Sequence, residues 1–399
     1  MQLCEIDQNR LSTKQNSSSI DTAHYTGSVT NNNSIIVRSK DAPPSITAID
    51  LFAGAGGFSL AAHNVGIKIL AAVEISKHAC STYRKNLIER MGLDIRLLGD
   101  INDLTPEEMI SKVPTLSKGC DLLMGGPPCQ GFSSHRFKDK GVDDPRNELL
   151  IRYFYFVNAL RPKVFLVENV PGLLWARHKD YLERFWHAAS DAGYVLHDPV
   201  ILNACDYGVP QRRRRAFILG IRSDIKLDLS WPPETTHCKP GQDKKANEDK
   251  PEWVKAAEVL KAPLSEDDPN GIHMNHSPEM IQRFKNTPIN GGSRSESGHV
   301  LPCHENHDGH KDCYGRINPA NVGPTMTTAC INPSKGRFVH PTEHHGITLR
   351  HAARFQTFPD DFIFEGGLIA GGTQVGNAVP VKLGEVLLQE IVTGLLAGK

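Results

Sequence analysis

The sequence has no excess of either charge and no long apolar run. Its 45 Lys and Arg residues balance 45 Asp and Glu residues, so the formal net charge is zero. This balance excludes proteins that hold polyanions by bulk positive charge, as histones do, but it allows a local basic groove. No stretch of about 18 uncharged apolar residues occurs, so we predict no transmembrane helix and no membrane partner.

The sequence also lacks a secretory signal and closely paired cysteines. Residues 1–7 contain neither a basic segment nor an apolar core. The nine cysteines are an odd number, and none of them form a C-x-x-C pair, which argues against a disulfide-stabilised secreted protein. We therefore expect a cytoplasmic protein in which some thiols serve chemistry rather than structure.

The composition changes along the chain and suggests several parts. Residues 1–44 contain Asn- and Ser-rich runs with few large apolar residues, and we interpret them as a disordered tail, or as an artefact of the N-terminus. Residues 45–229 read as one regular domain. Residues 230–325 are rich in Pro, Gly and His and predict a smaller, loop-rich domain. Residues 326–399 become regular again and end in a helical stretch at 382–396. There is no internal repeat.

Short apolar runs alternate with helical patterns in the first regular part. Strand-like runs occupy residues 46–52, 69–73, 96–98, 121–124 and 164–167. Helical patterns lie at 58–64, 77–90 and 148–160. This alternation predicts an α/β fold with a doubly wound, mostly parallel sheet. Ligands of such sheets bind beyond the carboxyl ends of the strands. The residues that fall there are Gly54, Glu74, Asp100, Pro127 and Glu168.

A glycine-rich turn follows the first predicted strand, in the run Asp50-Leu-Phe-Ala-Gly-Ala-Gly-Gly-Phe58. Such a turn lets a ligand approach the backbone and directs helix N–H groups at it. Glu74 ends the next strand, about twenty residues after the glycine turn, and an acidic residue at this sequence separation suits a ribose diol. Asp100 is placed to accept a hydrogen bond from an exocyclic amine. Together these residues indicate a nucleoside cofactor, although a glycine turn occurs in any doubly wound fold.

A second motif, Gly125-Gly-Pro-Pro-Cys-Gln-Gly-Phe-Ser133, presents Cys129 at the edge of the same crevice. Cysteine is the most nucleophilic side chain near neutral pH. Most single cysteines are small core residues. The rigid Pro-Pro and the glycines around Cys129 favour a nucleophile instead.

Two further motifs supply a carboxyl group and a cluster of cations. Glu168 begins the run Glu-Asn-Val-Pro after an apolar strand, where it is placed to donate a proton, or alternatively to cap a helix. Gln211 begins the run Gln-Arg-Arg-Arg-Arg before another strand. Strand alternation would direct Arg213 and Arg215 to one face and the other two arginines to the opposite face. A solvated basic surface is the alternative.

These four motifs, in this order, resemble those of the C5-cytosine DNA methyltransferase family. The run Gly376-Asn-Ala-Val-Pro380 resembles the family's closing motif, and Arg354-Phe-Gln-Thr-Phe-Pro-Asp360 resembles the motif before it. The resemblance covers about residues 46–396. It implies the S-adenosylmethionine-dependent methyltransferase fold, with residues 230–325 as the target-recognition domain.

The resemblance also implies the reaction and the roles of individual residues. A methyl group would pass from S-adenosylmethionine to C5 of a cytosine that is flipped out of duplex DNA. Cys129 would add to C6 of the base, Glu168 would hydrogen-bond N3 and the exocyclic amine, and Arg215 would hold O2. Arg213 would help to fix the backbone around the site.

Cofactor and DNA contacts are implied in the same way. The cofactor-binding residues would be Phe52, Gly54, Gly56, Glu74, Asp100, Ile101, Pro127, Asn377 and Val379. The DNA-binding residues would be Gln130, Ser133, Arg136, Gln211, Arg294 and Arg316, and residues 130–147 would form a mobile basic lid. We expect a monomer that acts on the bacterial nucleoid, as a stand-alone enzyme or beside a restriction endonuclease for the same site.

Three features depart from the pattern or leave an alternative open. Ala378 stands where the family often has Ser, and His351 where Glu is common, which questions loop anchoring rather than chemistry. The cluster Cys303, His304, His307, His310 and Cys313 has spacing that zinc could use, but we predict no metal. Three other functions remain as alternatives. A tRNA substrate is disfavoured because no Cys-Phe-Thr tripeptide occurs, and a nicotinamide oxidoreductase is disfavoured by the absence of G-x-G-x-x-G. The third alternative is a catalytically silent binding module.

Overall fold

The fold is described by a computed structural model that covers residues 46–128, 148–241, 249–298 and 312–398. The described residues all belong to one compact unit, Pro44–Lys399. Within them, no helix is long and apolar enough to cross a bilayer.

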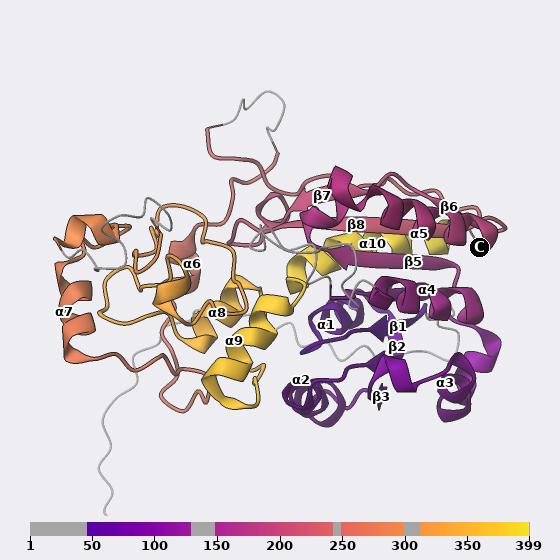
Figure 1. Ribbon diagram of the computed structural model, residues 1–399, viewed down its shortest axis with the longest axis horizontal. Helices are drawn as coiled ribbons and strands as arrows, with labels where there is room; N and C mark the ends of the chain where they lie inside the picture. The colour runs from indigo at the N-terminus through magenta and orange to yellow at the C-terminus, as the bar shows by residue number, and fades with distance from the viewer. Residues whose placement is uncertain (1–45, 129–147, 242–248, 299–311, 399) are drawn as a thin grey trace, which may run out of the picture. The chain divides into compact units, whose positions relative to one another are not determined.

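Eight strands form one mixed sheet in the described part of the chain (Figure 1). Their order is β3-β2-β1-β4-β5-β8-β6, and β7 pairs with β8 as well. The first five strands run parallel, whereas β8 is antiparallel to β5, β6 and β7. The strands are β1 Thr47–Leu51, β2 Lys68–Val73, β3 Arg96–Leu98, β4 Leu122–Gly125, β5 Val164–Asn169, β6 Tyr194–Leu196, β7 Val200–Asn203 and β8 Arg214–Arg222.

Both faces of the sheet are buried, so the middle of its central strands is apolar. In β5, Val164 and Leu166 point into one hydrophobic cluster, whereas Phe165 and Val167 point into another. This alternation follows from the two-residue repeat of a strand. Strands covered on both sides have no polar face, which explains the continuous apolar runs of the sequence.

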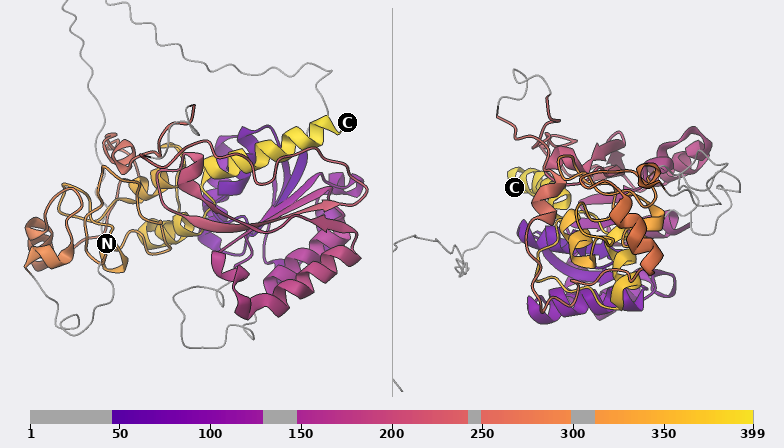
Figure 2. Two further views of the ribbon diagram at one scale, coloured as in Figure 1. Left: turned by 90° about the horizontal axis from the view of Figure 1, so that it is seen from above. Right: turned by 90° about the vertical axis from the view of Figure 1, so that its left-hand side faces the viewer.

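Helices cover each face of the sheet, as Figure 2 shows. One face is covered by α1 (Gly57–Asn64), by α2 (Lys77–Tyr83) with its π-helical continuation Arg84–Arg90, and by α10 (Val381–Ala397). The other face is covered by α3 (Pro106–Lys112), α4 (Glu148–Leu160) and α5 (Lys179–Asp191). Helix α3 starts with a capping box, in which Thr105 and Glu108 satisfy each other's backbone N–H groups.

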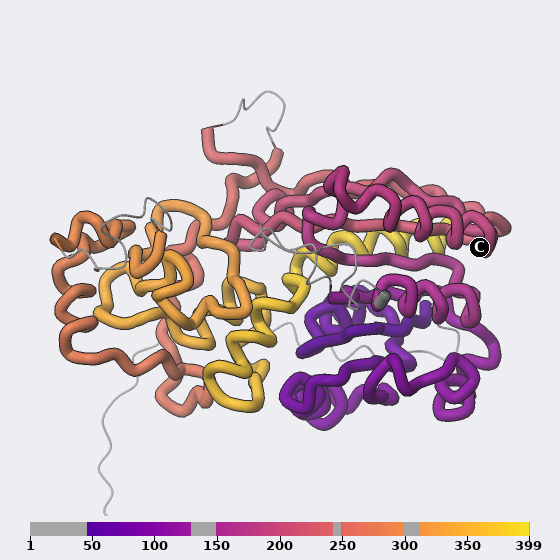
Figure 3. The backbone as a smooth tube through the Cα atoms, in the orientation of Figure 1, coloured from indigo at the N-terminus to yellow at the C-terminus, as the bar shows by residue number. Residues whose placement is uncertain are grey.

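In its described residues, the chain between β8 and α10 contains little regular structure, as the trace in Figure 3 illustrates. Its described helices are α6 (Ala256–Leu260), α7 (Pro278–Asn286), α8 (Leu349–Phe355) and α9 (Gly367–Asn377). Helix α8 contacts α6 and α9, and α10 then returns to pack on α1. The loop-rich character predicted for residues 230–325 is therefore found in their described parts.

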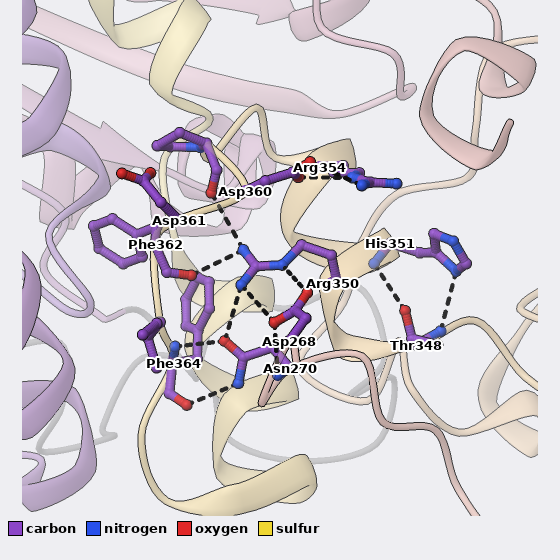
Figure 4. Close-up of polar contacts among 12 residues, drawn as sticks. Asp268, Asn270, Thr348, Arg350, His351, Arg354, Asp360, Asp361, Phe362 and Phe364 are labelled. Atoms are coloured by element: carbon purple, nitrogen blue, oxygen red, sulfur yellow. Dashed lines mark hydrogen bonds and ion pairs between the residues drawn. The ribbon is translucent and has the colours of Figure 1, made fainter. Parts of the chain in front are cut away.

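A buried arginine ties the loop-rich segment to the chain that follows α8 (Figure 4). Arg350 forms a bidentate ion pair with Asp268, at 2.6 and 3.0 Å, and donates to the main-chain oxygen of Phe362 at 2.8 Å. Asn270 exchanges two hydrogen bonds with the main chain of Phe364. Two segments far apart in the sequence are thus joined by direct hydrogen bonds.

The predicted α/β class and mostly parallel sheet are confirmed. The helix at 148–160 has the predicted bounds, whereas 77–90 is α-helical only to Tyr83. Strand β5 extends to Asn169, so Glu168 lies within the strand rather than after it. The short strands β6 and β7 and the helices α3 and α5 were not predicted, because their apolar residues are few or follow no clear period.

Candidate active site

The glycine turn after β1 is built by backbone angles that favour glycine. Gly54 and Gly56 have φ angles of 56° and 95°, and Phe52 also has a positive φ, of 60°. No heavy atom beyond its chain neighbours lies within 4 Å of the position that a Cβ on Gly54 would occupy. The turn therefore leaves open space beside its backbone, as a bound ligand requires.

Glu74 closes one side of this turn. Its Oε2 accepts a hydrogen bond from the Gly54 N–H at 2.8 Å, and its Oε1 accepts one from the Ser76 N–H at 2.7 Å. Burial raises the pKa of Glu74, although the backbone N–H groups lower it. The carboxyl is held in one orientation with lone pairs left for a hydroxyl ligand.

The side chain of Ile75 was missed by sequence reasoning. It lies directly after Glu74 and is 70% exposed, beside the only acidic residue bonded to the glycine turn in the described chain. A large apolar side chain exposed at a polar crevice is a candidate ligand contact. A single isoleucine after an acidic residue carries no sequence signal.

Asp100 and Ile101 follow β3 and take different positions. The Oδ1 of Asp100 accepts a hydrogen bond from the Asn102 N–H at 2.9 Å, and the residue remains partly exposed. Ile101 is buried in the second hydrophobic cluster. Only its main chain is therefore available to a ligand.

The closing motif lies directly against the start of α1. A Cβ on Gly57 would lie 2.6 Å from the main-chain oxygen of Val379, so only glycine permits this approach. Asn377 is exposed and Val379 is buried. The structure thus brings the closing motif against the glycine turn, and cofactor binding by Asn377 and Val379 stays a prediction.

Glu168 and Arg215 form the charged centre of the site. Strands β5 and β8 are antiparallel, with Glu168 opposite Phe217, so Arg215 lies next to the carboxyl. The Arg215 Nε is 2.9 Å from Oε1 of Glu168, and the latter residue is 8% exposed. The N–H does not point at this oxygen, so the contact is an ion pair without hydrogen-bond geometry. Both groups keep capacity for a ligand.

The chain leading to Cys129 lies beside this pair. A Cβ on Gly126 would lie 3.2 Å from Oε2 of Glu168. The main-chain oxygen of Pro127, a buried residue, accepts a hydrogen bond from Asn169 Nδ2 at 3.1 Å. The turn before Cys129 is therefore fixed to the strand that carries Glu168.

Arg213 is a positioning residue and lies inside the protein. It donates to the main-chain oxygens of Met326, Gly376 and Ala378 at 2.9, 2.9 and 3.0 Å. Burial, and then the neighbouring Arg215 cation, lower its pKa. Arg212 and Arg214 are exposed, so the four arginines alternate in exposure as predicted.

Two predicted DNA contacts are wrong, because both side chains are completely buried. Gln211 donates to the Phe355 main-chain oxygen and to Gln356, both at 2.7 Å, and accepts from the Met326 N–H. The Arg316 guanidinium is surrounded by main-chain oxygens that accept its N–H groups, those of Phe284, Thr287, His340 and Glu343. Neither side chain can reach DNA in this structure. Both motifs looked exposed because glutamine and arginine usually are.

The third predicted contact, Arg294, is half-buried. It lines a small pocket with Met280, Phe284 and Tyr314, and its Nη1 is buried without a hydrogen-bond partner in the described chain.

Several predicted residues lie outside the described residues. These are Cys129, Gln130, Ser133 and Arg136, together with the proposed lid at 130–147 and the tail. Cys303, His304, His307 and His310 also lie outside, whereas Cys313 is described and buried. In the described ranges, no group of three or more His, Cys, Asp or Glu residues is arranged to hold a metal.

A buried acidic network below the glycine turn was also missed. Asp50 accepts a hydrogen bond from Ser59 Oγ at 2.6 Å, and Ser59 accepts one from the Tyr83 hydroxyl at 2.7 Å. Burial raises the pKa of Asp50 to about 7, against the lowering effect of Ser59. Its position before a glycine turn gave no indication that the carboxyl would face inward.

His351 resolves one departure from the family pattern. The ring Nδ1 of His351 accepts a hydrogen bond from the Thr348 backbone N–H at 3.4 Å. The backbone N–H of His351 donates to Thr348 Oγ1 at 3.1 Å. This is the capping box in which Glu or Gln usually occupies the third helical position. A neutral histidine therefore anchors α8 in place of the expected carboxylate.

The mixed sheet with helices on both faces is an α/β methyltransferase fold, and similarity to known proteins identifies the family. The family model for C-5 cytosine-specific DNA methylase matches residues 46–393. The chain belongs to this family and is a DNA (cytosine-5-)-methyltransferase.

Its relatives include restriction–modification enzymes. It is 33% identical over 360 residues to the type II methyltransferase M.Eco47II of Escherichia coli, covering 87% of this chain and 78% of that protein. It is 31% identical to M1.HphI of Haemophilus parahaemolyticus, with 87% of each covered. A solved prophage-encoded protein of E. coli, described as a DNA modification methyltransferase, matches with a TM-score of 0.64 and 26% identity over 88% of this chain and all of that one.

Proposed function

We propose that this enzyme methylates C5 of a cytosine within one short duplex DNA sequence, using S-adenosylmethionine, base flipping and a covalent bond from Cys129 to C6. The observation that carries the proposal is the pairing of Glu168 with Arg215, whose closest atoms are 2.9 Å apart. The pairing edge of cytosine carries an amino donor and a carbonyl acceptor. A carboxylate beside a guanidinium matches that edge with one acceptor and one donor.

The crevice fits S-adenosylmethionine. Open space beside Gly54 suits the methionine end, and the oriented carboxyl of Glu74 suits a ribose diol. Ile75 and Asp100 offer an apolar surface and an acceptor for adenine. When bound there, S-adenosylmethionine supplies the methyl group that becomes attached to C5.

The chain's own residues prepare the cytosine. Addition of the Cys129 sulfur to C6 makes the ring an enamine that is nucleophilic at C5. N3 takes up a proton from solvent as the sulfur adds, so that Glu168 accepts hydrogen bonds from N3–H and from the amino group, while Arg215 donates to O2 as charge develops. Loss of the C5 proton to a solvent base, departure of the Cys129 sulfur as a thiolate and release of the N3 proton then restore the aromatic ring.

The type II relatives support a role in a restriction–modification system. We propose that the chain acts as a monomer and protects one recognition sequence against a cognate endonuclease. Exposed arginines at the carboxyl edge of the sheet support a local DNA-binding surface on a protein without net charge.

Bisulfite sequencing of a plasmid from a methylation-deficient host that expresses the chain tests the proposal. We expect protected cytosines within one short motif, and none when Cys129→Ser is expressed at the same level. Purified enzyme should transfer labelled methyl groups to that duplex and not to tRNA. Methyl transfer to tRNA alone would show that the substrate is RNA rather than DNA. If the folded protein methylates neither DNA nor tRNA, the proposed activity is contradicted.

A further inference from the structure

The segment that follows β5 forms a rigid step beside Glu168. Two short 3₁₀ turns, Pro171–Leu174 and Ala176–His178, are separated by Trp175. The Trp175 N–H donates to the Gly172 oxygen at 3.2 Å, and the His178 N–H donates to the Trp175 oxygen at 2.8 Å. Trp175 is nevertheless 39% exposed. Because the backbone is fixed on both sides, this exposure is a property of the fold.

Arg177 is held over this tryptophan from two directions. Its guanidinium carbon lies 4.7 Å from the centre of the Trp175 ring, within the range of a cation–π contact. Its Nε donates a hydrogen bond to Nε2 of His178 at 2.9 Å. His178 is buried, so the acceptor is enclosed by the protein. The guanidinium therefore has little freedom to lose when it binds a ligand.

The protonation state of His178 is consistent with this arrangement. Burial, and then the neighbouring Arg177 cation, lower the pKa of His178 to about 4. The imidazole is consequently neutral at physiological pH, and its Nε2 keeps the lone pair that Arg177 needs.

The terminal nitrogens of Arg177 are left for a ligand. The residue is exposed, and among the described residues no group accepts a hydrogen bond from Nη1 or Nη2 or forms an ion pair with it. Glu183, in the helix that follows, is paired with Lys179 at 3.3 Å. A planar guanidinium with both ends free matches two oxygens of a phosphate.

We propose that Arg177, supported by Trp175 and His178, binds a backbone phosphate of the target DNA next to the flipped cytosine. The proposal rests on the proposed function, since DNA supplies the phosphate. Arg177 lies in the segment that follows the carboxyl end of β5, the strand that carries Glu168. A phosphate bound here would fix the DNA backbone at the nucleotide that is rotated out. This contact would contribute equally to the affinity for every DNA sequence.

The first test compares DNA affinity across salt concentrations. At low salt we expect Arg177→Ala to weaken binding about tenfold, with a log–log salt slope reduced by about 0.9, the amount for one phosphate contact. Arg177→Lys should retain the slope but lose part of the affinity, because ammonium is a point charge. Arg96→Ala is the matched control, since Arg96 is exposed at the amino end of β3. It should change neither quantity.

The second test identifies the phosphate. Duplexes carrying the mapped site receive one neutral methylphosphonate at a time, and binding is measured for the wild type and for Arg177→Ala. We expect one position near the target cytosine that weakens the wild type but not the variant. If every position weakens both proteins equally, or if the salt slope is unchanged, Arg177 does not bind a phosphate.

Structural damage and failure of the proposed function give different results. Arg177→Ala should keep the wild-type melting temperature and cofactor affinity, and loss of both would assign Arg177 a structural role instead. A wild-type enzyme that does not methylate DNA would contradict the proposed function itself, whatever the variants do.

Discussion

A Cβ on Gly57 would lie 2.6 Å from the main-chain oxygen of Val379 and 3.2 Å from Cζ of Phe358. The first turn of α1 and the closing motif of the chain therefore touch through a position that admits only hydrogen. This contact joins the glycine turn to the segment that begins α10.

Gly57→Ala should separate these segments and weaken cofactor binding. We expect the free energy of unfolding to fall by about 1–3 kcal/mol, the usual cost of inserting a methyl group into a packed interface. Urea denaturation and calorimetric titration with S-adenosylmethionine measure the two effects. Gly99→Ala is the control, because nothing lies within 4 Å of its Cβ position. Equal stability of the two variants would argue against the contact.

Arg213 and Arg215 should respond differently to the same substitution. Arg213→Lys removes hydrogen bonds to three buried carbonyl groups, so we expect a loss of about 2–4 kcal/mol in stability. Arg215→Lys should leave the melting temperature nearly unchanged and lower the turnover number with the mapped DNA site. Calorimetry and methyl-transfer kinetics separate the pair. A stable Arg213→Lys enzyme would refute the positioning role.

Asp50 should make stability fall as the pH rises. Its pKa is raised to about 7 in the folded protein, so the folded state favours the neutral carboxyl. The stabilisation is complete below about pH 4 and is lost as the pH rises through 7. Asp50→Asn carries no charge and keeps an acceptor for Ser59. Relative to the wild type, it should gain on the order of 2–4 kcal/mol between pH 4 and 8. Urea denaturation measures the unfolding free energy of both proteins at each pH. A difference between them that stays constant from about pH 4 to 8 would contradict this prediction.

His351 should act in the opposite direction. Burial, followed by the neighbouring His340 and Arg354, lowers its pKa to about 3, so the folded state favours the neutral ring. The stabilisation is present above about pH 6.5 and is lost as the pH falls toward 3. His351→Gln keeps the capping box without titrating. It should match the wild type at pH 7 and exceed it by about 2 kcal/mol at pH 5 in thermal unfolding. His187→Gln, at an exposed position, should not reproduce this gain.

DNA that contains 5-fluorocytosine at the target should trap the enzyme. Fluorine at C5 cannot leave as a proton does, so the bond from Cys129 to C6 should persist after methyl transfer. A denaturing gel with S-adenosylmethionine should show one covalent complex. Cys129→Ser should bind the same duplex without forming it. If the wild-type enzyme forms no covalent complex with this DNA, the covalent mechanism is excluded.

The parts of the site that the sequence predicts are those set by local geometry. A strand followed by a glycine turn places Gly54, and a strand end places Glu74 and Asp100, whatever the rest of the chain does. The alternating exposure of the four arginines also follows from the strand repeat alone.

The remaining contacts depend on pairing between distant segments. Glu168 meets Arg215 because β8 is antiparallel to β5, and no local pattern reports the direction of a neighbouring strand. Gln211 and Arg316 are buried because distant carbonyl groups accept their N–H groups. Asp50 looks like a surface acid until Tyr83 and Ser59 enclose it. The sequence therefore indicates the motifs but not which of their polar side chains are buried.

The environment of Arg316 has an evolutionary consequence. The acceptors of its guanidinium are mainly peptide oxygens, which every amino acid provides. Substitutions at the positions that supply those oxygens can alter a surface while the internal brace stays satisfied. The buried hydrogen bonds of Arg316 can therefore be kept while the surface side chains around them change. A new DNA sequence preference could then evolve through exposed side chains, with every intermediate variant still folded.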